Sequence, residues 1–164
     1  MFEGVYTAMI TPFNEDESLD EGALRALVDF QIEQGIAGLV PVGTTGESPT
    51  VDHEENIEVV RIVVDQAKGR VPVIAGTGSN STREAVDMTV RARDVGATAT
   101  LQVAPYYNKP NQEGFYRHFT TVADKGELPV LVYNIPGRTG KNIENETMLR
   151  MAQHPKIVGV KEAS

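Results

Sequence analysis

The sequence has 164 residues and a formal net charge of −8, with 40% hydrophobic and 23% charged residues. This length suits one domain with a substantial core, and the acidic balance argues against nucleic acid or an anionic membrane surface as a partner. The absence of cysteine excludes disulfides, thiolate metal sites and cysteine nucleophiles. We expect a cytoplasmic protein, because neither a secretory signal nor an apolar run long enough to cross a membrane is recognisable.

Six short apolar runs, nearly continuous in Val, Ile and Leu, alternate with longer stretches of helical period. Such runs are typical of strands that are buried on both faces of a parallel sheet. The predicted strands span residues 5–10, 38–42, 71–75, 99–104, 129–135 and 157–160. Helices are predicted over 21–34, 57–67, 85–95, 112–125 and 144–153, and the second and third carry one clear apolar stripe.

Local signals mark several helix ends. Ser81 to Glu84 form a capping-box sequence, which predicts the start of the third helix. Gly35, Gly69 and Gly96 follow predicted helices at positions that favour a left-handed backbone. The order is therefore strand and helix repeated five times, followed by a sixth strand.

Two architectures fit this alternation: a doubly wound parallel sheet, or part of a (β/α)₈ barrel. The length favours the doubly wound sheet, since a barrel needs about 250 residues, but the pattern itself does not separate the two. A doubly wound receiver module would need acidic residues after the first strand and an Asp closing the third. This sequence has residues 9–11, Met-Ile-Thr, and residues 76–78, Gly-Thr-Gly, at those places.

In either architecture, ligands bind at the carboxyl ends of the strands. The turn 43–46 offers backbone N–H groups with the hydroxyls of Thr44 and Thr45, which suit a carboxylate or phosphate, although an ordinary Gly-rich turn has the same sequence. Lys161 ends the last apolar run. A lysine in an apolar setting loses its proton more readily and can attack a ketone, whereas at a solvated strand end it is merely a cation.

Other polar residues follow neighbouring strands. Tyr133 is predicted at the height of Lys161 on the adjacent strand, with Tyr107 one strand further away, and both are either proton-transfer groups or ordinary core residues. Arg138 is either a carboxylate ligand or a surface arginine. The histidines lack metal-ligand spacing, so we expect surface or structural roles and no metal site: His53, His118 and His154.

Four motifs at these strand ends, in order along the whole chain, resemble the 4-hydroxy-tetrahydrodipicolinate synthase (dihydrodipicolinate synthase) family of pyruvate-dependent class I aldolases. They span residues 43–47, 105–110, 133–140 and 159–162. The resemblance implies a (β/α)₈ TIM barrel, of which the sequence covers about the first six strands and five helices, and a homotetramer built as a dimer of dimers. It also implies the condensation of pyruvate with aspartate 4-semialdehyde, without a cofactor other than pyruvate bound covalently to Lys161.

The resemblance also implies the roles of the remaining residues. Tyr133 would relay protons and would be linked through Thr44 to Tyr107, which would reach in from a partner subunit. Thr45, with the backbone of Thr44, would hold the pyruvate carboxylate, and Arg138 would bind the carboxylate of the semialdehyde.

Some members of the family are inhibited by lysine at a cleft between subunits. The residues that match this regulatory site are Ser48, His53, Asn80, Glu84 and Tyr106. Asn56 stands where inhibited members often carry a His, and Glu84 also has an explanation as the acidic member of the capping box. Sensitivity to lysine therefore stays open.

Two alternatives to this function remain. N-acetylneuraminate lyase and the 2-keto-3-deoxy-sugar-acid aldolases share the lysine and the tyrosine. Arg138 and the paired threonines, Thr44 and Thr45, favour the 4-hydroxy-tetrahydrodipicolinate synthase family over these enzymes. The other alternative is a non-catalytic fragment. The resembled enzymes continue for two βα units and a helical domain, so we expect residues 1–164 to be the N-terminal part of a single barrel domain, with two open sheet edges and weak or no catalysis.

Overall fold

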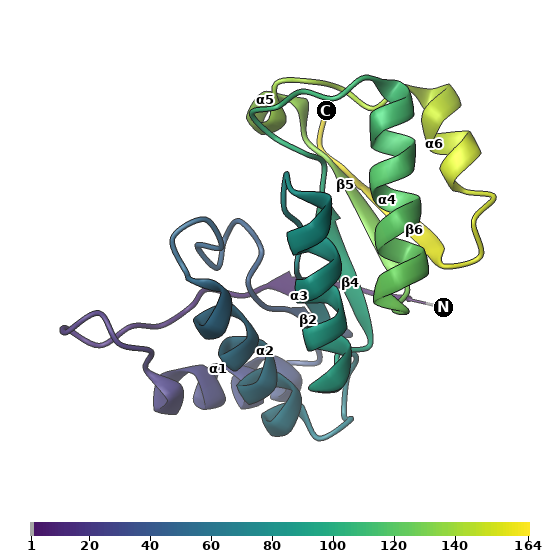
Figure 1. Cartoon of the computed structure of the whole chain (residues 1–164). Helices are drawn as coiled ribbons and strands as arrows, with labels where there is room; N and C mark the ends of the chain where they lie inside the picture. Colours follow the sequence, from purple (N-terminus) through teal and green to yellow (C-terminus); the bar gives the residue numbers. More distant parts are fainter. Residues whose placement is uncertain (1) are drawn as a thin grey trace.

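Parallel strands and helices alternate along the chain in the computed structural model, which describes residues 2–164 (Figure 1). The elements are β1 (Tyr6–Ala8), α1 (Glu21–Glu33), β2 (Gly38–Val40), α2 (His53–Ala67), β3 (Ile74–Gly76), α3 (Thr82–Asp94), β4 (Ala99–Val103), α4 (Gln112–Gly126), β5 (Val130–Asn134), α5 (Pro136–Thr139), α6 (Asn145–Met151) and β6 (Ile157–Glu162). The predicted alternation is confirmed, with β1 to β5 shorter than expected and β6 two residues longer.

The structure adds one short helix, α5, that the sequence pattern did not predict. It is a single turn that begins with Pro136, whose fixed φ suits the first turn of a helix, and it ends at Gly140 in a left-handed conformation. The glycines after α1, α2 and α3 have the predicted positive φ values. No helix within residues 2–164 is both long and apolar enough to cross a membrane.

The order of the strands decides between the two architectures. Neighbouring strands follow the chain order, β1–β2 and β3–β4–β5–β6, all in parallel, and a single parallel bridge between Leu39 and Val73 joins the two groups. The helices contact one another in the same succession, so they form one row along the sheet (Figure 1). A doubly wound sheet reverses its strand order and has helices on both faces. The fold is therefore a (β/α)₈ barrel, of which this chain covers the first six strands.

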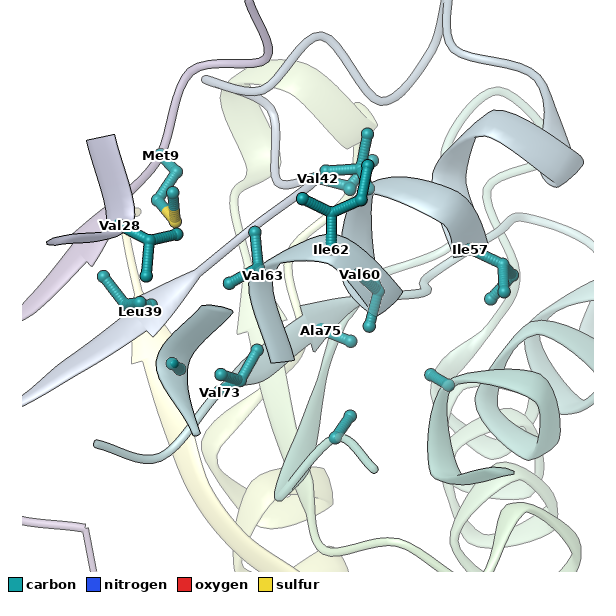
Figure 2. Close-up of a cluster of buried hydrophobic side chains, with 14 of the residues drawn as sticks. Met9, Val28, Leu39, Val42, Ile57, Val60, Ile62, Val63, Val73 and Ala75 are labelled. Carbon is teal, nitrogen blue, oxygen red and sulfur yellow. The ribbon is translucent and has the colours of Figure 1, made fainter. Parts of the chain in front are cut away.

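The core lies mainly between the sheet and this row of helices. Figure 2 shows the larger cluster, in which Leu39 and Ala75 from β2 and β3 accompany Val60 and Val63 of α2. A second cluster centres on α4, where Phe119 is fully buried. The face of the sheet away from the helices carries a smaller apolar cluster, which includes Val40, Ile74, Leu101 and Tyr133. This layering leaves the carboxyl ends of the strands available for a site.

The beginning of α3 differs from the predicted capping box. The Ser81 hydroxyl accepts the Glu84 backbone N–H at 3.4 Å, as expected, but the Glu84 carboxylate instead accepts the Ser79 hydroxyl at 2.8 Å. The reciprocal bond is therefore not made at α3. A complete capping box occurs at α2, where Asp52 and Glu55 each accept the other's backbone N–H.

The burial predicted for the last strand is wrong. The sequence pattern predicted a strand buried on both faces, but Val158 and Val160 of β6 are 46% and 50% exposed. The physical reason is that β6 pairs only with β5, and no other strand within residues 2–164 lies along its second edge.

Candidate functional site

The carboxyl ends of the central strands surround a small cavity of about 30 Å³. Its wall includes Thr44 from the turn after β2, Gly76 at the end of β3, Gly78 two residues further along the chain, and Tyr133 of β5. In a (β/α)₈ barrel, active sites are built at this end of the strands. The structure thus brings together residues that are about 90 positions apart in the sequence, from Thr44 to Tyr133.

The turn that carries Thr44 is held tightly against the end of β3. Val42 enters this turn with a left-handed φ of 51°, which β-branched residues rarely adopt. A Cβ on Gly76 would overlap the Val42 carbonyl oxygen, so the close approach requires glycine. The Thr11 hydroxyl, which is buried, donates to the Gly46 carbonyl at 2.7 Å. The supporting roles of Thr11, Val42 and Gly76 were not predicted from the sequence, where the only local signal was their place at the end of a strand or just after it.

Lys161 and Tyr133 meet on adjacent strands, as predicted. The two residues are paired in the register of β5 and β6, and the Lys161 Nζ lies 4.2 Å from the centre of the Tyr133 ring. Tyr133 is buried, whereas Lys161 is exposed as a residue although its amine rests on the ring. Partial loss of water lowers the pKa of Lys161, which increases the fraction of neutral, nucleophilic amine.

Tyr107 is not brought to this cavity. It is 91% exposed, and its backbone has a left-handed φ of 70° in the loop after β4. Two hydrogen bonds fix the loop to the segment after β3: the Asn80 amide donates to the Tyr106 carbonyl at 3.2 Å, and the Asn108 amide donates to the Asn80 carbonyl at 3.0 Å. The loop therefore presents the Tyr107 side chain outward from this chain.

A larger cavity of about 430 Å³ adjoins the first. The two share Thr44, Ser48, Gly78 and Val103 in their walls. Arg138 of α5 also lines the larger cavity; it is exposed and makes no ion pair within residues 2–164. Thr45 is exposed and lines neither cavity. A free guanidinium beside an open cavity is suited to binding a carboxylate.

Most of the residues predicted for a regulatory site share this larger cavity. Those that line it are Ser48, His53, Glu84 and Tyr106. Asn80 is outside its wall and instead holds the loop after β4. Asn56 also lines the cavity: its amide donates to the Gly76 carbonyl at 3.4 Å, while its buried Oδ1 has no hydrogen-bond partner within residues 2–164. An acceptor is therefore left available to a ligand.

The three histidines are separate from one another in the fold. His118 is buried between α3 and α4, where its Nδ1 shares a hydrogen bond of 2.9 Å with the Thr82 hydroxyl. His53 is exposed at the start of α2, and His154 contacts Asp124 at 3.0 Å. Among residues 2–164, no three His, Asp or Glu side chains are grouped as a metal site.

A (β/α)₈ barrel that places a lysine of lowered pKa beside a tyrosine at its carboxyl end belongs to the class of barrel enzymes. Comparison with known protein families identifies the family of barrel enzymes to which the chain belongs. Residues 1–164 match the "Dihydrodipicolinate synthetase family", and the chain belongs to this family.

Individual relatives agree with that assignment. The 4-hydroxy-tetrahydrodipicolinate synthase of Gluconacetobacter diazotrophicus is 59% identical over 164 residues, which are 100% of this chain and 55% of the relative. The chloride-inhibited dihydrodipicolinate synthase of Acinetobacter baumannii, complexed with pyruvate, is 48% identical with a TM-score of 0.98, covering 100% of this chain and 56% of that one. The enzyme from Cyanidioschyzon merolae with lysine bound is 44% identical with a TM-score of 0.96, over 99% of this chain and 56% of the other. The chain thus spans about half the length of the curated relatives it matches.

Proposed function

We propose that the protein condenses pyruvate with L-aspartate 4-semialdehyde to give 4-hydroxy-tetrahydrodipicolinate, the first committed step of diaminopimelate and lysine biosynthesis. The observation that carries the proposal is the Lys161 amine, which rests 4.2 Å from the centre of the Tyr133 ring at the carboxyl end of the barrel. Membership of the family supports the choice of reaction, as does the pyruvate complex of the Acinetobacter baumannii enzyme.

The proposed chemistry begins with the neutral amine of Lys161. It attacks the ketone carbon of pyruvate, and loss of water leaves an iminium ion. Loss of a methyl proton converts the iminium to an enamine, whose carbon attacks the aldehyde of the second substrate. The amino group of the semialdehyde part then attacks the lysine-bound carbon, which closes the ring and releases Lys161. No separate cofactor is needed, because the iminium itself accepts the electron pair.

The remaining residues have roles around this amine. Tyr133 relays protons in concert with Thr44, which lies in the wall of the same cavity. Thr45 and the backbone of Thr44 hold the pyruvate carboxylate, and Arg138 binds the carboxylate of the semialdehyde. Tyr107 completes the relay in a neighbouring subunit of a homotetramer, a role supported by its 91% exposure on a strained backbone.

Trapping with borohydride tests the proposed function. Incubation of the chain with pyruvate and sodium borohydride should reduce the Schiff base to a stable adduct, located by intact mass and peptide mapping. We expect one pyruvyl adduct on Lys161, which disappears in Lys161→Ala and persists in the control Lys156→Ala. A folded chain with no adduct on Lys161, or with equal labelling of Lys156, would refute the proposal.

We infer further that the 430 Å³ cavity binds lysine as a regulator. The Glu84 carboxylate, the His53 side chain and the Asn56 Oδ1, which has no partner among residues 2–164, together suit the two ammonium groups of lysine. The Cyanidioschyzon merolae enzyme was solved with lysine bound, which supports this choice of ligand. Calorimetric titration with L-lysine should give binding that Glu84→Gln weakens and that Glu146→Gln, on the surface of α6, leaves unchanged. Equal weakening by both variants, or no binding, would contradict the inference.

A further inference from the structure

A second cross-strand contact lies directly beside the Lys161–Tyr133 pair. Asn134 of β5 is 1% exposed, and its side-chain amide donates to both carboxylate oxygens of Glu162 at 3.0 Å and to the Asn142 Oδ1 at 2.7 Å. The Asn134 Oδ1 in turn accepts the Ile143 backbone N–H at 3.2 Å. Both ends of this buried side chain are therefore hydrogen-bonded.

Glu162 is also tied to its own end of the strand. Its carboxylate accepts the Ser164 backbone N–H at 2.9 Å, and the Asn134 carbonyl accepts the Ala163 backbone N–H at 3.0 Å. The hydrogen bonds from Asn134 lower the pKa of the Glu162 carboxyl, so its acceptor form is retained at neutral pH. Side-chain and backbone bonds together lock the last residues of β6 onto β5.

These hydrogen bonds fix the register of β6 against β5, which the rest of the strand does not fix by itself. Tyr133 pairs with Lys161 and Asn134 with Glu162, but the pairing shifts between Val130 and Leu131, so the two ends of β6 are in different registers against β5. Because side chains alternate between the faces of a strand, a slip of one residue would turn Lys161 to the opposite face, away from Tyr133. The exposed apolar residues of β6 give little packing to oppose a slip.

We propose that Asn134 and Glu162 are positioning residues for Lys161, which set the register of the end of β6 so that the amine lies against Tyr133. The proposal rests on the proposed function, because it concerns the orientation of the nucleophile of that reaction. Neither residue needs to touch the substrate: they lie on the opposite face of the sheet from the Tyr133–Lys161 pair.

The test measures the protonation of Lys161 without any substrate. The rate at which an amine-selective acylating reagent labels Lys161 is followed against pH by peptide mass spectrometry, which gives the titration midpoint of this lysine. In Glu162→Leu the midpoint should rise toward about 10.4, the value of a free lysine. Pyruvate trapping at neutral pH should then slow by about tenfold for each pH unit of that rise. Glu162→Gln retains an acceptor for the Asn134 amide, so its titration midpoint and its trapping rate should both stay close to those of the unaltered chain. Glu146→Leu should change neither quantity.

The outcomes separate this proposal from the proposed function. An unaltered midpoint in Glu162→Leu, with the far-ultraviolet circular dichroism of the unaltered chain, would overturn the positioning role. If Glu162→Leu does not fold, Glu162→Ala, which also lacks an acceptor for the Asn134 amide, decides: a midpoint raised toward about 10.4 supports the proposal, and an unchanged midpoint overturns it. Absence of a pyruvate adduct in the unaltered chain counts against the proposed function alone, since the labelling midpoint needs no pyruvate.

Discussion

β4 and β6 have the same kind of apolar sequence and opposite surroundings. β4 lies between β3 and β5, and its first four residues are buried. Within residues 2–164, β6 has a single neighbouring strand, and five of its six residues are exposed. The difference shows that composition and run length determine that a segment is extended, whereas its neighbours determine whether it is buried.

A polar side chain in each strand also reflects the difference in surroundings between β4 and β6. Gln102 of β4 is completely buried: its Nε2 donates to the hydroxyls of Thr77 and Thr100 at 2.7 Å, while its Oε1 has no hydrogen-bond partner within residues 2–164. Glu162 of β6 has a comparable hydrogen-bonded partner in Asn134 but is exposed on its other sides. A buried polar group must find its partners inside the fold, while one on an open strand can also use water.

The largest expected effect contrasts the core under α4 with the surface of β6. Phe119→Ala removes a ring that is 0% exposed and should lower the free energy of unfolding by about 3–5 kcal/mol. Val160→Thr, at a half-exposed position, should change it by less than about 0.5 kcal/mol. Urea denaturation measures both. A cost at Val160 close to that at Phe119 would mean that β6 is covered in solution.

The next contrast concerns two histidines and acid. Burial lowers the pKa of His118 to about 4, against about 6.5 in the unfolded chain. Below pH 6.5, the pKa of His118 in the unfolded chain, the unfolded state binds more protons than the folded state. The contribution of neutral His118 to the free energy of unfolding is therefore complete above pH 6.5 and is lost as the pH falls toward 4. The loss should approach about 3 kcal/mol, from about 1.4 kcal/mol for each pKa unit.

Urea midpoints measured between pH 4 and 7 check this expectation. His118→Gln should flatten the dependence in that range, although it will also change the stability at neutral pH. His154→Gln, which alters the segment before β6, is the control for loss of a histidine. If it flattens the dependence as much as His118→Gln does, the assignment to His118 is wrong.

Two glycines provide a smaller contrast. A methyl group at Gly76 would overlap the Val42 carbonyl oxygen, and Gly76→Ala should cost about 1–3 kcal/mol and disturb the turn that carries Thr44. At Gly159 in β6 the nearest atoms, in Leu131, would be 3.9 Å away, so Gly159→Ala should be close to neutral. Thermal unfolding compares the two, and equal destabilisation would show that the approach of Val42 is not what requires glycine.

The smallest expected effect concerns the first residues of two helices. Asp52 caps α2 in a full capping box, and Asp52→Ala should cost about 1 kcal/mol. Glu144 precedes α6 without a side-chain cap bond, so Glu144→Ala should have almost no effect. The difference between their urea midpoints is the measurement, and a larger loss at Glu144 would reverse the expected order.

Much of the candidate site was predictable because it depends on local order along each strand. The pairing of Lys161 with Tyr133 followed from counting residues to the ends of two adjacent strands, and the structure confirms it. The left-handed backbone of Val42 and the bond between Glu84 and Ser79 were not predictable. The first arises where two segments distant in sequence, around Val42 and Gly76, press together. The second is a local choice, five residues apart, between two donors for the Glu84 carboxylate, and the residue types do not settle that choice.

Apart from the one-turn helix α5, the sequence by itself determined which segments are strands and helices, since hydrophobic period, caps and glycines act within a few residues. It also determined the residues that end each strand, from Thr44 to Lys161, and hence the chemistry that collects at one edge of the sheet. Only the tertiary structure decided that the strands follow chain order under one row of helices, and that β6 is exposed. These features depend on how the strands pair and which elements cover them, and the same local pattern permits a barrel or a doubly wound sheet.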